Sequence, residues 1–143
     1  MTLLTPKTQF RSIFGEKKDW SAEALSLAKA AEAGNDDAQT QLGLLHYNGT
    51  GVPKNYAEAA KWFRKAAEQG SAHAQSILGH IYWYGEGVPK DFTQAHAWIN
   101  ISAANGFHMA KLEMPIYEDE MTPTQIAEAQ KLARELWEKL PKK

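Results

Sequence analysis

The sequence predicts an all-α fold, a right-handed α-solenoid of helix-turn-helix repeats, on the basis of two observations. The first is that Gly34, Gly70 and Gly106 lie 36 residues apart. The second is that apolar residues between these glycines recur at the three- and four-residue spacing of an amphipathic helix. A period of this length is typical of solenoids, in which stacked units bury a core that no unit can bury alone.

Two units, 34–69 and 70–105, agree through both helices and the turn between them. The glycine-rich segments 49–54 and 85–90 match at the same 36-residue spacing, and so do Trp62 and Trp98. The first helices match at small, amide and apolar positions: Ala38 with Ala74, Gln39 with Gln75, Leu42 with Leu78, and Gly43 with Gly79. Small residues at fixed points let two helices approach closely, so we expect these positions to form the contact between the helices.

Each unit divides into two helices. The first is expected over about 36–47 in the leading unit and to end at the glycines of the turn. Asn55 and Asp91 are good N-caps for the second helices, because a short side-chain oxygen can accept from free backbone amides. The leading unit's second helix should then run to about residue 69. Trp62 and Trp98 share one repeat position and are expected to be structural.

The ends of the chain are predicted to close a single domain over residues 1–143. Residues 1–20 form an N-terminal cap, and 21–33 are the second helix of a degenerate unit. Residues 106–120 begin a partial repeat in which Met114 and Pro115 replace Leu and Gly, so its helix should be short or kinked there. Residues 121–143 form a C-terminal capping helix, which opens on Thr122 and Pro123 in a capping box.

The repeated pattern resembles the Sel-one-like repeat family. It reads Ala-x-x-x-Leu-Gly, then Gly-x-Gly-Val, then Ala and Trp, then Ala-Ala and Gly. The family is related to the tetratricopeptide repeat and is lengthened by the glycine-rich turn. The resemblance covers the chain from about residue 20 onward and is more specific to fold than to function. It implies a protein interaction module whose concave groove is lined by the first helix of each unit.

The candidate binding residues are therefore the first-helix side chains that the packing positions do not use. Tyr47, Trp83 and Tyr84 are the strongest candidates, because large aromatics give much contact area for little lost rotamer entropy. Trp83 or Tyr84 packing against the next helix is the alternative. The set comprises Asp37, Thr40, Leu44, Tyr47 and Asn48 in the first unit, and His73, Ser76, His80, Trp83 and Tyr84 in the second.

Composition argues against several other functions. Sixteen basic and seventeen acidic residues give a formal net charge of −1, which provides no electrostatic reason to expect nucleic acid or an anionic membrane surface. The absence of cysteine excludes disulfides, thiolate zinc sites and cysteine nucleophiles. Residues 1–20 contain no uninterrupted apolar run of a signal peptide or a membrane span, so we expect a cytoplasmic protein.

No motif indicates a cofactor, a metal or catalysis. The five histidines include no pair at the four-residue spacing that places two metal ligands on one helix face, and His46 aligns with Tyr82, which favours a packed histidine. The Gly-x-Gly-Val segments are not followed by the Gly-Lys-Ser/Thr of a phosphate loop, so they are expected to be structural turns. No spacing suggests a catalytic triad or a pair of acids.

The resulting hypothesis is a non-enzymatic adaptor or scaffold that binds a partner protein or peptide in the concave groove and needs no cofactor. One alternative is a bacterial antidote that neutralises a toxin or effector by binding it. A second alternative is a hydrolase, since some cysteine-rich members of the family have been linked to β-lactam hydrolysis. The chain departs from that subgroup because it has no cysteine.

Overall fold

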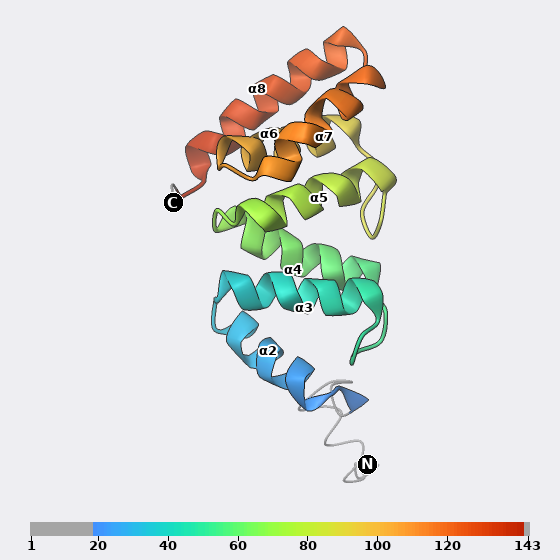
Figure 1. Ribbon diagram of the computed structural model, residues 1–143, viewed down its shortest axis with the longest axis vertical. Helices are drawn as coiled ribbons and strands as arrows, with labels where there is room; N and C mark the ends of the chain where they lie inside the picture. The colour runs from blue at the N-terminus through green and yellow to red at the C-terminus, as the bar shows by residue number, and fades with distance from the viewer. Residues whose placement is uncertain (1–18, 142–143) are drawn as a thin grey trace, which may run out of the picture.

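The computed structural model describes residues 19–141, which form a stack of seven helices without strands. The predicted all-α solenoid is confirmed. The chain reverses direction after each helix, so that α3, α5 and α7 form one layer and α2, α4, α6 and α8 the other (Figure 1). The helices are α2 (Ala22–Glu32), α3 (Asp36–Asn48), α4 (Tyr56–Glu68), α5 (Ala72–Tyr84), α6 (Phe92–Ala104), α7 (His108–Asp119) and α8 (Pro123–Lys139).

Three helices, α4, α6 and α8, begin at the predicted capping residues. The Asn55 side chain accepts a hydrogen bond from the Glu58 amide at 3.0 Å, and Asp91 accepts one from Gln94 at 3.0 Å. Each bond satisfies a backbone donor that the first turn of a helix leaves free. At α8, Thr122 forms the predicted capping box.

Two glycines allow the paired helices of each repeat to approach closely. A Cβ atom on Gly43 of α3 would lie 2.6 Å from the Phe63 ring of α4. A Cβ atom on Gly79 of α5 would lie 2.7 Å from Ile99 and 2.9 Å from the Ala95 carbonyl oxygen of α6. All three distances are shorter than packed atoms tolerate, so only glycine fits at these two positions.

Proline replaces this glycine in the partial third repeat. Pro115 lies 36 residues after Gly79, and the backbone of α8 packs closely against α6, instead of pairing with α7 as α4 pairs with α3. The expectation of a helix shortened at Pro115 is wrong, because α7 continues past it to Asp119. One face of α7 is therefore left without a closely packed helix.

Buried glutamines connect one repeat to the next, a role that the sequence pattern did not reveal. The Gln39 amide donates to the Ala31 carbonyl oxygen at 3.0 Å, and Gln75 donates to Ala67 at 3.0 Å. Each glutamine also accepts through its Oε1, Gln39 from Gln69 at 2.8 Å and Gln75 from Asn105 at 2.9 Å. Each glutamine thus gives a carbonyl at the end of the preceding helix a second donor, beside the Gly34 amide on Ala31 and the Gly70 amide on Ala67.

Aromatic and apolar side chains fill the space between the two layers. Trp62 is 9% exposed and Trp98 is 1% exposed, which confirms that both are structural. His46 is buried as predicted, with its ring centroid 5.1 Å from that of Trp20. The predicted N-terminal cap, 1–20, lies almost entirely outside the described residues.

We expect Gly79→Ala to destabilise the protein by about 2 kcal/mol, within the usual range for overpacking a core. Gly43→Ala should be partly rescued by Phe63→Leu, because its clash is with a side chain alone. Gly79→Ala should not be rescued by Ile99→Val, because the Ala95 carbonyl oxygen remains in the way. Urea denaturation of the single and double variants measures both effects, and a Gly79→Ala variant as stable as wild type would contradict this packing account.

Candidate functional site

A groove runs across the layer formed by α3, α5 and α7. It consists of two cavities of about 240 and 150 Å³ that share Leu44 of α3. The larger cavity is lined by Leu44, Tyr47, Ser76, Ile77, His80 and Glu113, and the smaller by Asp37, Thr40, Gln41, Leu44, Ser71 and His73. Three successive first helices therefore contribute to one continuous surface, which we call the groove.

Seven of the nine principal candidate residues line this groove: Asp37, Thr40, Leu44, Tyr47, His73, Ser76 and His80. Thr40 and Ser76 lie in its floor, since both are buried. The Thr40 hydroxyl donates to the Asp36 carbonyl oxygen at 3.0 Å. Tyr84 is 61% exposed and lies beside the groove, with its ring centroid 4.7 Å from that of His80.

The prediction that Trp83 contacts a partner is wrong. Its side chain is 7% exposed and is stacked between two rings, Phe92 at a centroid distance of 4.1 Å and Tyr117 at 4.2 Å. Phe92 comes from α6 and Tyr117 from α7, so Trp83 joins three helices. The packing alternative considered for Trp83 therefore applies, whereas Tyr84 next to it remains accessible.

Sequence analysis missed the contribution of α7. Met109, Leu112 and Ile116 are 52%, 54% and 63% exposed, and they occupy the repeat positions of Asp37, Thr40 and Leu44, counted in steps of 36. We call these three residues the α7 stripe. The 36-residue register assigns these three residues to groove positions, although the repeat motif itself ends at Met114 and Pro115.

Two carboxylates border the larger cavity. Glu86 in the glycine-rich turn accepts hydrogen bonds from the Tyr47 hydroxyl at 2.9 and 2.8 Å, and its Oε1 lies 3.9 Å from His80 Nε2. A Cβ atom on the adjacent Gly87 would lie 2.4 Å from the Tyr56 carbonyl oxygen, so glycine lets this turn pack directly on α4. Burial, followed by the hydrogen bonds to Glu86, raises the pKa of Tyr47 to about 12.

Glu113 is the second carboxylate, and it enters the cavity from α7. Burial raises the pKa of Glu113, and the charge of His80 opposes that shift only partly. Within residues 19–141, no lysine or arginine forms an ion pair with Glu113. The groove therefore combines apolar side chains with a carboxylate that has no lysine or arginine partner in the described part of the chain.

The groove also contains the residue types of a hydrolytic triad, in Ser76, His80 and Glu113. No hydrogen bond joins Ser76 to His80 or His80 to Glu113, so the contact between nucleophile and base that such chemistry requires is missing. The described part of the chain has no group of three potential metal ligands. None of its helices is long and apolar enough to span a membrane.

A scan against protein-family models matches this chain twice to the Sel1 repeat, over residues 36–71 and 72–107. The chain belongs to the Sel1 repeat family. Each match begins two residues later than the unit counted from the glycines. The first begins at the first residue of α3 and the second at the first residue of α5. Sel1 repeats generally mediate protein–protein interactions.

Solved structures of other Sel1 repeat proteins are similar to this one. A protective antigen of uropathogenic Escherichia coli with an SLR fold has a TM-score of 0.79 and 39% identity over 82% of this chain and 25% of that chain. A Sel1 repeat protein from Oxalobacter formigenes has a TM-score of 0.67 and 33% identity over 82% of this chain and 53% of that chain. This chain thus spans about a quarter of the first and half of the second. The search of curated proteins finds no match.

Trp83→Ala and Tyr84→Ala should separate a structural aromatic from an accessible one. We expect Trp83→Ala to lower the free energy of unfolding by about 3–5 kcal/mol, as large-to-small changes of buried aromatics do. Tyr84→Ala should change it by less than about 0.5 kcal/mol, as is usual for surface substitutions. Urea denaturation measures both, and equal losses for the two variants would show that their burial has been assigned wrongly.

Proposed function

We propose that this Sel1 repeat chain is an adaptor that binds a segment of a partner protein in the groove and along the α7 stripe. The exposure of the stripe supports this proposal most strongly. Of the five large apolar side chains exposed among residues 19–141, Met109, Leu112, Ile116 and Tyr84 lie on α5 and α7, and only Leu25 lies elsewhere. Contiguous exposed apolar side chains on a protein surface mark sites of interaction.

The helical geometry of α7 places the stripe beside the groove. At 3.6 residues per turn, Met109 and Ile116 lie within about 60° of Glu113 around the helix axis, and Glu113 lines the larger cavity. A segment held in that cavity by Leu44 and Ile77 would therefore also reach the stripe. Burying an apolar side chain of this size contributes about 1.5–3 kcal/mol, so a few such contacts favour binding.

The same groove would serve an antidote that neutralises a toxin by binding it, because binding is the common step. An enzymatic function is not supported by the groove, since its serine, histidine and glutamate are not joined by hydrogen bonds. No cofactor or nucleic acid is needed for the proposed role. The binding surface is proposed to consist of Asp37, Thr40, Leu44, Tyr47, His73, Ser76, His80 and Tyr84 with the α7 stripe.

Site-specific photo-crosslinking tests this proposal. A benzophenone amino acid at Leu112 or Ile116 should give adducts with a partner in extracts of the source organism, because both side chains are exposed on the stripe. The matched controls carry the same amino acid at Glu128 or Lys131, which are exposed on α8 in the other layer. The proposal predicts a shared adduct from both stripe positions and none from the controls.

The crosslinked partner should then lose binding to purified Leu112→Ser, Ile116→Ser protein while binding the Glu128→Ser control as before. Both variants change exposed side chains, so both should remain folded. An adduct that forms only from α8, or a partner that binds the stripe variant as tightly as wild type, would show that the binding surface lies elsewhere.

A further inference from the structure

Positively charged residues are absent from the helices that form the groove, with one exception. Neither α3 nor α5 contains a lysine or an arginine, and α7 contains Lys111 alone. Lys111 occupies the repeat position of Gln39 and Gln75, whose side chains turn toward the preceding helix rather than into the groove. Among residues 19–141, the groove therefore has no lysine or arginine on the side where Glu113 lies.

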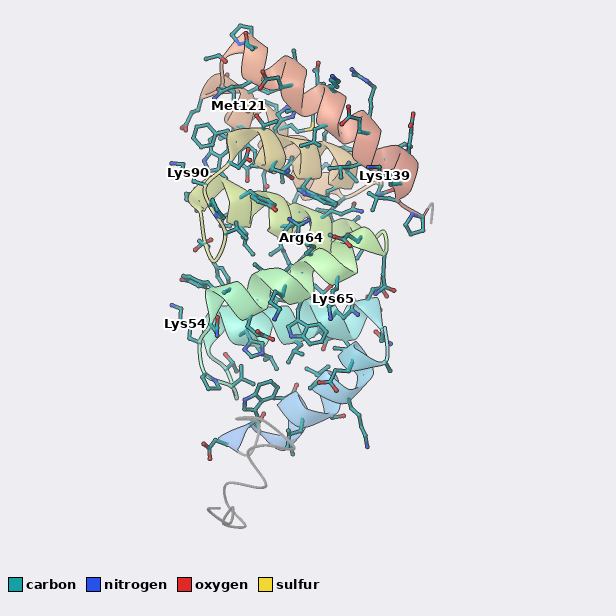
Figure 2. All side chains as sticks on the ribbon, turned by 180° about the vertical axis from the view of Figure 1, so that it is seen from behind. Lys54, Arg64, Lys65, Lys90, Met121 and Lys139 are labelled. Atoms are coloured by element: carbon teal, nitrogen blue, oxygen red, sulfur yellow. The ribbon has the colours of Figure 1, made fainter. Side chains whose placement is uncertain are left out.

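Apart from Lys111, the lysines and arginines of residues 19–141 lie instead on the opposite layer and in the turns. Seen from behind, Arg64 and Lys65 project from α4, and Lys139 lies at the end of α8 (Figure 2). Several of them already have local partners. The Arg64 guanidinium lies 3.6 Å from Glu68, and the Lys65 ammonium lies 4.7 Å from the centroid of the Trp62 ring.

The larger cavity is correspondingly acidic. Glu113 lines it directly, and Glu86 borders it through its hydrogen bonds to Tyr47. His80 lies near both carboxylates. Glu86 uses both of its oxygens on Tyr47, whereas the described residues supply Glu113 with no hydrogen-bond donor. Glu113 is therefore the carboxylate available to a ligand.

A partly buried carboxylate among apolar side chains is stabilised most by a cation, because the attraction between opposite charges strengthens as water is excluded. An acidic peptide or a nucleic acid would instead be repelled. The length of the α7 stripe also suits a short peptide segment. Met109 and Ile116 are about 10 Å apart along the axis of α7, at 1.5 Å per residue, and an extended peptide of three to four residues covers that length.

We infer that the groove binds a segment of a partner protein in which one lysine or arginine contacts Glu113 and the flanking apolar side chains contact Leu112 and Ile116. The inference rests on the proposed function and specifies the chemistry of the bound segment. Glu113 confers the preference for a basic residue, and the α7 stripe provides apolar contact area. Leu44 and Ile77 line the cavity on the other side of the segment.

Selection from a phage library of random twelve-residue peptides tests this inference on the full chain. Wild type should enrich peptides with a lysine or arginine between apolar residues, and Glu113→Lys should not. Binding of one synthetic selected peptide is then measured by fluorescence anisotropy. Glu113→Gln should weaken it about tenfold, which corresponds to about 1.4 kcal/mol. Glu135→Gln on α8, the matched control, should leave it unchanged.

A double-mutant cycle identifies the contact itself. Replacing the basic residue of the peptide with methionine should weaken its binding to wild type about tenfold but hardly affect its binding to Glu113→Gln, as expected when one charged pair accounts for both losses. Equal losses on both proteins would contradict the inference. So would enrichment of peptides that are acidic or lack a basic residue.

Two variants distinguish failure of this inference from failure of the proposed function. If the selected peptides lack a basic residue but lose binding to Leu112→Ser, Ile116→Ser protein, the basic preference is wrong and the groove remains the binding surface. If they bind that variant as tightly as wild type, or if no sequence is enriched, both the inference and the proposed function are wrong.

Discussion

The close approach of two helices at a glycine is the contact on which the rest of the structure depends. Gly43 and Gly79 allow α3 to pack on α4 and α5 on α6 at distances that a single added carbon atom would prevent. This packing separates the helices into two layers and leaves α3 and α5 side by side. The groove is the exposed surface of the first layer, so its shape follows from contacts made on the opposite sides of the same helices.

The third repeat shows what happens when that contact is lost. Pro115 stands at the glycine position, and α8 packs its backbone against α6 rather than against α7. Side chains of α7 still reach the core, where Tyr117 stacks on Trp83. The opposite face of α7 exposes Leu112 and Ile116. The helix in which proline replaces the glycine is thus also the helix that exposes an apolar surface next to the groove.

Residues whose role repeats from unit to unit could be predicted from the sequence. Asn55 and Asp91 cap helices, and Trp98 is buried, because the 36-residue register assigns the same surroundings to each matched pair. Trp83 could not be placed in this way. Its burial depends on Tyr117, which belongs to the partial repeat and lies 34 residues away. Glu113 could not be identified because the cavity that it lines is formed by residues of α3, α5 and α7, which come together only in the fold.

A partner segment is proposed to bind across α5 and α7 on the groove side. Hydrogen–deuterium exchange of the chain, alone and saturated with a peptide that it binds, tests this claim directly. We expect slower exchange of amides in α5 and α7 and unchanged exchange in α4 and α8, because α5 and α7 adjoin the groove and the stripe whereas α4 and α8 lie in the other layer. Slower exchange confined to α4 and α8 would contradict it.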